Sequence, residues 1–251
     1  MGLDAGVDPA QRFSSRVEAY ARYRPSYPRE TLGVLERECG LTAACKIADI
    51  GSGTGLLARL LLDFGCEVTG VEPNPEMRAA GERMLSGEPR FQSVEGRAEA
   101  TKLPDNSVDF VTAGQAFHWF EPAAARAEFQ RILKPGGWVV LIWNERLVTP
   151  GFMAGHEELQ NKFAREKPHP AEAEFNAFYG HAAWRLARIP NRQSLDGEGL
   201  RGRIESSSWS PLPGADGYEA MMLEMLRLFR KYERDGRVTI EYETHIYYGR
   251  L

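Results

Sequence analysis

The first part of the chain alternates short apolar runs with stretches of helical periodicity. Residues 46–50 (KIADI) are typical of a short buried strand, and residues 67–72 (EVTGVE) predict a second one. After each strand, apolar residues recur at the spacing of one helix face. The first helix is marked by Leu57, Leu60, Leu61 and Phe64, and the second by Met77, Ala80, Met84 and Leu85. The pattern predicts a β-α-β unit, whose strands must be parallel.

Three further apolar segments continue this alternation, at residues 90–96, 107–114 and 137–143. A helical stretch marked by Ala125, Phe129, Ile132 and Leu133 lies between the last two. LKPGG at 133–137 is predicted to end that helix, because Pro135 cannot continue it and Gly136 permits a left-handed turn. Five such units predict an α/β fold with a Rossmann-like, doubly wound, mostly parallel sheet.

The C-terminal part has a different pattern. Val238, Ile240, Tyr242, Ile246 and Tyr248 alternate with polar residues, as in a strand buried on one side. We expect an antiparallel last strand here, preceded by a sixth strand at 203–212 (RIESSSWSPL), which gives a seven-stranded sheet. The helix between these strands carries a methionine and aromatic stripe, at 218–232, that favours a core contact.

Residues 145–200 separate the predicted fifth and sixth strands. They contain two weakly amphipathic stretches, and roughly fifty residues are more than a simple crossover needs. Because insertions above the carboxyl edge of such a sheet usually cover a ligand, we expect a helical lid. An oligomer interface is the alternative, since exposed apolar helix faces also serve association. Residues 1–251 are expected to form a single domain.

Composition narrows the function classes. The 251 residues carry 31 Lys and Arg against 35 Asp and Glu, for a net charge of -4, which favours small-molecule chemistry over nucleic-acid binding. The three cysteines lack metal-ligand spacing, so we predict no metal site. The longest apolar run, 138–143, is too short to span a membrane, and the first residues lack a signal-peptide core. We expect a cytoplasmic monomer or homodimer without membrane partners.

The glycines in ADIGSGTG, residues 48–55, follow G-x-G-x-G rather than the G-x-G-x-x-G of dinucleotide sites. Asp49 lies two residues before the first glycine, where a carboxylate would repel a diphosphate and attract an ammonium group. Glu72, which closes the second strand, can accept hydrogen bonds from both ribose hydroxyls. Glu99 follows the third strand, where an adenine amino group would meet it. Together, Asp49, Glu72 and Glu99 predict a cofactor that contains adenosine and carries a positive charge.

In order, IADIGSGTG, GVEPN, EGRAEATKLPDNSVDFVTAGQAFHWF and RILKPGGW resemble the motifs of class I S-adenosylmethionine-dependent methyltransferases. The resemblance is close over about residues 12–144. FSSRVEAYARYRPSYP at 13–28, together with AFHWF, is similar to the small-molecule branch that includes trans-aconitate methyltransferase. The resemblance implies S-adenosyl-L-methionine as cofactor, S-adenosyl-L-homocysteine as product and a small-molecule acceptor methylated on O, N or S.

The resemblance also implies roles for residues of this chain. Asp49, Gly51 and Gly53 would meet the methionine portion, Glu72 the ribose, Pro73 and Asn74 the adenine edge, and Ala98 with Glu99 the adenine amino side. Ser52 and Gly55, in the same glycine turn, are also expected to bind the cofactor, and Gln115 would face the methionine or the transferred methyl group.

An amine, phenol or alcohol acceptor must lose a proton, and His118 is the best-placed base. A carboxylate acceptor would need no base, and His118 and Arg24 would then only hold it. Tyr20 and Arg24 belong to an N-terminal segment, 1–40, that we expect to cap the site, with a surface-packed arm as the alternative. Tyr27, Trp119 and Asn144 are candidate substrate contacts, although Trp119 suits a cofactor-pocket wall as well, and His118 could simply pack the pocket or the sheet edge.

Three other functions are alternatives to a small-molecule methyltransferase. A cofactor-binding protein without turnover would show the same motifs. RNA or DNA methylation is disfavoured by the acidic balance and by GQAFHW, which lacks the Pro-Pro-aromatic arrangement that grips a flipped adenine. A nucleotide-dependent dehydrogenase is disfavoured because it would need the spacing G-x-G-x-x-G, whereas this chain has G-x-G-x-G.

Overall fold

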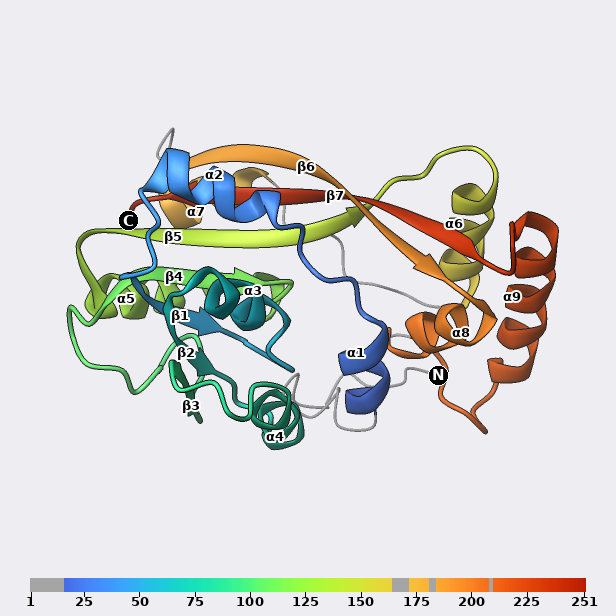
Figure 1. The fold of residues 1–251 in the computed structure, drawn as a ribbon, viewed down its shortest axis with the longest axis horizontal. Coiled ribbons are helices and arrows are strands. Elements are labelled where there is room, and N and C mark those ends of the chain that lie inside the picture. The colour runs from blue at the N-terminus through green and yellow to red at the C-terminus, as the bar shows by residue number, and fades with distance from the viewer. Residues whose placement is uncertain (1–15, 164–171, 181–183, 208–209) are drawn as a thin grey trace.

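The computed structural model describes residues 16–163, 172–180, 184–207 and 210–251, and its centre is a seven-stranded sheet in the order β3-β2-β1-β4-β5-β7-β6 (Figure 1). The first five strands are parallel to one another. They are β1 (Lys46–Ile50), β2 (Glu67–Val71), β3 (Phe91–Val94), β4 (Val108–Gly114) and β5 (Leu133–Arg146). β7 (Val238–Gly249) is antiparallel to both β5 and β6 (Trp184–Leu195). The predicted mixed, Rossmann-like sheet is confirmed.

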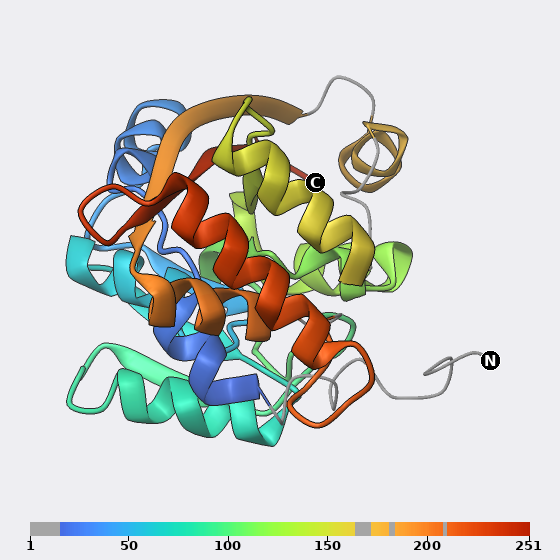
Figure 2. The ribbon, with the colours of Figure 1, turned by 90° about the vertical axis from the view of Figure 1, so that its right-hand side faces the viewer.

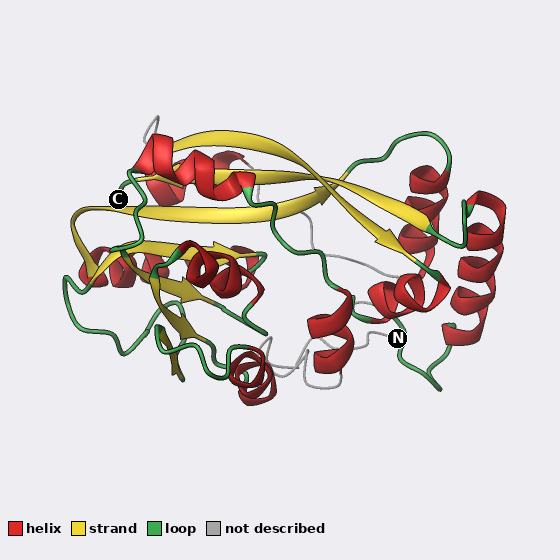
Figure 3. Ribbon diagram, in the orientation of Figure 1, coloured by secondary structure: helices red, strands yellow, loops and turns green. Residues whose placement is uncertain are grey.

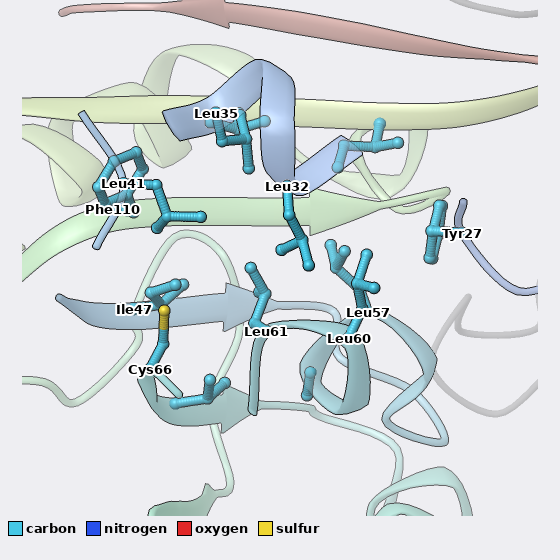
Figure 4. Close-up of a cluster of buried hydrophobic side chains, with 14 of the residues drawn as sticks. Tyr27, Leu32, Leu35, Leu41, Ile47, Leu57, Leu60, Leu61, Cys66 and Phe110 are labelled. Carbon is cyan, nitrogen blue, oxygen red and sulfur yellow. The ribbon is translucent and has the colours of Figure 1, made fainter. Parts of the chain in front are cut away.

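Helices cover both faces of the sheet (Figure 3). One face packs against α2 (Glu30–Cys39) and α3 (Leu56–Phe64), and Figure 4 shows this core, in which Leu32 and Leu61 meet Ile47 and Phe110. The other face packs against α5 (Pro122–Ile132) and α7 (Glu172–Tyr179). α4 (Pro75–Met84) follows β2. The strands between these layers are buried on both faces, as their apolar runs predict.

The predicted end of α5 is confirmed. The helix stops at Ile132, and Gly136 has a φ of +79°, in the left-handed region that glycine favours. β5 begins directly at Leu133 and runs to Arg146, so this strand extends beyond the predicted 137–143 at both ends.

The predicted sixth strand at 203–212 is wrong. The strand lies at 184–195, and residues 197–205 form α8 (Gly197–Glu205), whose first turn is capped by the Asp196 side chain. β6 lacks an apolar run because it is an edge strand, in which Arg188 and Arg192 are exposed and Pro190 removes one backbone donor. Its twelve residues are held by pairing with β7, which sequence periodicity does not reveal.

The predicted lid, 145–200, therefore needs revision. It contains the end of β5, the helices α6 (Phe152–Phe163) and α7, all of β6 and the start of α8. The ribbon of β6 and β7 extends past the parallel strands (Figure 1). It packs against α6, α8 and α9 (Tyr218–Tyr232), which we call the helical lobe (Figure 2). Its core includes Met221 and Met225, so the methionine stripe of α9 is a core contact as predicted.

The predicted N-terminal cap, 1–40, contains residues 1–15, the helix α1 (Val17–Tyr23) and the helix α2, which differ in their surroundings. Residues 1–15 lie outside the described residues. α1 packs against both α4 and α8, so it lies between the sheet domain and the helical lobe. α2 packs in the core, where Leu35 is almost fully buried, and the role of 1–40 as a cap stays a prediction. Within the described residues, no helix has the length and apolar character that crossing a membrane requires.

Candidate functional site

A pocket opens at the carboxyl ends of β1, β2 and β4, with about 800 Å³ of empty space including its mouth. Ligands of open α/β sheets bind at this edge. Ten predicted site residues line it: Tyr20, Gly51, Gly53, Glu72, Pro73, Asn74, Ala98, Glu99, Gln115 and Trp119. No described residue of 145–200 is among the lining residues, so the role of that segment as a lid stays a prediction.

The glycine turn after β1 requires its glycines. Gly51, Gly53 and Gly55 have φ values of +66°, +55° and +85°. A Cβ on Gly51 would lie 2.7 Å from the Ala116 Cβ, and one on Gly55 would lie 2.8 Å from Leu85 Cδ1. The first glycine therefore lets the turn approach the segment after β4, and the third lets it approach the end of α4.

Glu72 links this turn to the end of β2. Its Oε2 accepts from the Gly53 backbone N at 2.9 Å, and its Oε1 accepts from the Asn74 backbone N at 2.8 Å. The side chain is buried, which raises the pKa of the carboxyl, while the two backbone donors oppose that rise. Each oxygen keeps a lone pair for a further donor, such as a ribose hydroxyl.

Asp49 lies behind the lining, at the end of β1. It is 1% exposed, and its Oδ1 accepts from the Thr112 hydroxyl at 2.9 Å. Its Oδ2 is buried and has no hydrogen-bond partner among the described residues. Burial raises the pKa of this carboxyl to about 7. A buried carboxylate oxygen without a donor favours the arrival of a cationic or donating group.

Glu99 and the residue that follows the fourth strand complete the pocket. Glu99 Oε1 accepts from the Glu121 backbone N at 2.8 Å, which joins the loop after β3 to the start of α5. Gln115 has a φ of +58° directly after β4, and its Nε2 lies 3.5 Å from the Asn144 carbonyl oxygen. This left-handed backbone turns the chain back at the strand end, beside the pocket.

The wall that contains Trp119 is supported from behind by aromatic side chains. Phe117 lies in the 3-10 helix η3 (Phe117–Trp119), and its ring centre is 4.8 Å from that of Phe178 and 6.0 Å from that of Phe175. Both partners belong to α7, within the predicted lid. α7 therefore stabilises the pocket wall through the sheet face.

α1 contributes Tyr20 to the pocket. The Arg24 guanidinium carbon lies 4.8 Å from the centre of the Tyr20 ring, and Arg24 Nη2 donates to the Ser206 carbonyl oxygen at 2.8 Å. Arg24 itself is not a lining residue. It connects the pocket wall to the C-terminal end of α8, where a cation also interacts favourably with the helix dipole.

Other predicted residues lie outside the lining as well. Tyr27 is 8% exposed within the core, and Ser52 and Gly55 belong to the turn without facing the pocket. Asn144 is 8% exposed, and its Oδ1 accepts from Thr244 at 2.5 Å while its Nδ2 donates to the Ser26 carbonyl at 3.3 Å. These contacts make Asn144 an anchor between β5, β7 and the chain before α2.

His118 is half-buried in η3, with its ring centre 4.8 Å from that of Trp119. It is not among the lining residues, so its role as a base stays a prediction. The structure adds five lining residues that sequence reasoning missed: Met77, Arg97, Gly114, Ala116 and Phe120. Ala116 and Phe120 belong to the QAFHWF motif, which was the available signal. Met77 shows only the periodicity of a core residue.

Comparisons with known proteins show what this part of the chain resembles. Residues 48–141 match the family model described as methyltransferase domain. This part of the chain is thus similar in sequence to a methyltransferase domain. The match begins in β1 and ends in β5, so this domain contains the glycine turn, Glu72 and most of the pocket lining.

Relatives of the methyltransferase domain occur in bacteria and fungi. An uncharacterised methyltransferase of Mycobacterium tuberculosis is 42% identical over 139 residues, which cover 55% of this chain and 54% of that protein. The chain thus matches about half the length of this relative. A methyltransferase-like protein of Schizosaccharomyces pombe is 26% identical over 239 residues, 92% of each chain.

Solved structures share the fold around the methyltransferase domain. A protein from Anaeromyxobacter dehalogenans, assigned as a type II methyltransferase, has a TM-score of 0.63 at 20% identity and covers 91% of this chain and 98% of its own. Phosphoethanolamine N-methyltransferase 2 of Haemonchus contortus, in complex with phosphomonomethylethanolamine and S-adenosylhomocysteine, has a TM-score of 0.56 at 17% identity. It covers 94% of this chain and 57% of its own.

Proposed function

We propose that this chain transfers a methyl group from S-adenosylmethionine to a small-molecule acceptor and leaves S-adenosylhomocysteine. When bound, the cofactor supplies a sulfonium methyl that is already activated. The protein's part is then to bind, to orient the acceptor and to exclude water. The matching methyltransferase domain supports the proposal, as does the solved neighbour that contains S-adenosylhomocysteine.

The observation that carries the proposal is the pair of buried acids at the ends of β1 and β2. Asp49 offers an unpaired oxygen to an ammonium group, and Glu72 offers lone pairs beside the pocket to two ribose hydroxyls. Gly51 and Gly53 line the pocket, where a side chain at either position would be crowded by Ala116 or Met77. This donor and acceptor set fits a cationic nucleoside and would repel a diphosphate.

On the acceptor side, we propose that Tyr20 and Trp119 border the reacting groups, with His118 as base where the acceptor must lose a proton. The N-terminal similarity to trans-aconitate methyltransferase supports a small acceptor. We further propose that the protein acts in the cytoplasm as a monomer or homodimer.

Calorimetry with S-adenosylhomocysteine tests the cofactor, and labelled S-adenosylmethionine with a metabolite extract tests turnover. Glu72→Gln should weaken S-adenosylhomocysteine binding by roughly 10- to 100-fold, because a hydrogen bond to a charged group contributes about 1.5–3 kcal/mol. Glu67→Gln is the matched control, since Glu67 lies at the opposite end of β2 and pairs with Lys46 on the surface. Binding without transfer to any acceptor would favour a cofactor-binding protein, and no binding at all would refute the proposal.

A further inference from the structure

The outer side of α9 carries a line of four exposed side chains, which we call the α9 stripe. Its members are Glu219, Leu223, Leu226 and Arg230, at spacings of four, three and four residues. Residues three and four apart are neighbours on one side of a helix, so the four side chains follow one another along α9. The opposite side of α9 packs into the core of the helical lobe, and α9 lies at the surface of that lobe (Figure 2).

The two leucines of the stripe are unusual for a protein surface. They are 50% and 43% exposed, and the described residues contain only two other large apolar side chains that are exposed, Leu147 and Val148. α6 packs against α9 through Gly155 and Leu228, on a different side of the helix, and leaves the stripe uncovered. Apolar surface in water costs about 25 cal/mol per Å², so adjacent leucines on one helix face favour a partner that covers them.

The charged ends of the stripe restrict what that partner can be. Glu219 lies in the first turn of α9 and Arg230 in the last, and neither has an ion-pair partner within the part of the chain that the structure describes. Their order suits the dipole of α9, but the dipole gives no reason for the two leucines between them. A partner that covers the stripe must offer a basic group, two apolar groups and an acidic group in that order.

A second copy of α9 offers this order when it runs antiparallel. The stripe has the same spacing from either end, so a two-fold axis between the leucines places Glu219 of each copy opposite Arg230 of the other. The same axis places Leu223 of each copy opposite Leu226 of the other. Alternating spacings of three and four residues are those of the apolar seam in a two-stranded coiled coil. A parallel pair would instead place like charges opposite each other at both ends, which is unfavourable.

We propose that the α9 stripe is the interface of a homodimer in which two α9 helices pack antiparallel. α9 has 15 residues and is thus about 22 Å long, which limits the contact to less than the roughly 1,200–2,000 Å² of stable interfaces. The dimer is therefore weak and reversible. No residue of α9 lines the pocket at the carboxyl ends of the strands, so the inference does not depend on what that pocket binds.

Sedimentation equilibrium of the full chain, from about 1 μM to about 1 mM, tests the proposal. The weight-average mass should rise with concentration towards twice that of the monomer. Glu219→Arg and Arg230→Glu each place like charges opposite each other at both ends of the seam, so each should weaken dimerisation by roughly 10-fold or more. Arg37→Glu is the matched control, because Arg37 is an exposed arginine on α2, and this variant should dimerise normally.

The combination of the two charge reversals tests the antiparallel arrangement. An equimolar mixture of Glu219→Arg and Arg230→Glu restores opposite charges in the heterodimer, and the double variant restores them in its homodimer. Both should dimerise about as tightly as the unaltered protein. Each reversal also opposes the dipole of α9, so the double variant should have the lowest Tm, and its recovered dimerisation cannot come from greater stability. In a parallel pair, the double variant would keep like charges opposite each other.

Three results would overturn the proposal. They are a chain that stays monomeric at about 1 mM, a dimer that neither single reversal weakens, and a double variant that dimerises no better than the single variants. The second result would place the interface elsewhere on the protein, and the third would exclude antiparallel packing of α9.

Discussion

At the scale of single residues, the site depends on carboxylates whose partners are backbone groups. Glu72 accepts from Gly53 and Asn74, so one side chain fixes the shape of the turn and the start of α4. Its position could be predicted from the sequence because the carboxyl ends of parallel strands meet at one edge. The anchoring role of Asn144 could not, because its partners Ser26 and Thr244 are distant in sequence.

Asp49 gives a prediction about pH. Burial raises the pKa of its carboxyl from 3.8 to about 7, so the folded state binds this proton more tightly than the unfolded chain. The stabilisation is fully present below about pH 4 and is lost as the pH rises through 7, at about 1.4 kcal/mol per pH unit in that window. Denaturant unfolding from pH 4 to 8 should show this fall for the unaltered protein relative to Asp49→Asn. A difference that does not change with pH would contradict the assignment.

The glycine turn gives a second prediction. Gly51→Ala should abolish S-adenosylhomocysteine binding, because its Cβ would lie 2.7 Å from Ala116 beside the pocket. Gly87→Ala is the control, since Gly87 also has a positive φ, of +86°, but nothing lies within 4 Å of its Cβ position. Both variants should lose about 1–2 kcal/mol of stability from backbone strain, Gly51→Ala should lose more because of the contact with Ala116, and only Gly51→Ala should lose binding. Equal affinities in calorimetry would refute the steric argument.

At the scale of elements, the parallel strands could be predicted and the edge strand could not. β1 to β5 have apolar runs because helices cover both of their faces. β6 is specified by its twelve pairings with β7, a non-local contact that leaves no periodic signal. The same limit applies to α7, whose phenylalanines support η3 from more than fifty residues downstream.

α1 gives a prediction at this scale. Arg24 joins the Tyr20 ring to the Ser206 carbonyl, so Arg24→Leu should loosen α1 over the pocket. We expect S-adenosylhomocysteine affinity to fall by roughly 3- to 30-fold, the range of a partly buried cation–π contact. Arg22→Leu, which removes an exposed ion pair with Glu198, is the control and should bind normally. Identical affinities for the two variants would show that α1 does not contribute to cofactor binding.

At the scale of the whole molecule, the sheet and the helical lobe have separate tasks in our account. The matched region, 48–141, supplies most of the pocket that we propose binds the cofactor. The lobe carries α6, α8 and α9 on the ribbon of β6 and β7 (Figure 2). The sequence predicted the sheet but not the helical lobe, because the helices of the lobe pack mainly on one another and on β6 and β7.

The most direct test of the account is a crystal structure of the protein with S-adenosylhomocysteine. We predict that the ribose hydroxyls donate to Glu72, that the ammonium group approaches Asp49 and that the homocysteine sulfur faces Gln115. A ligand bound elsewhere, or in this pocket with its ribose away from Glu72, would contradict the account.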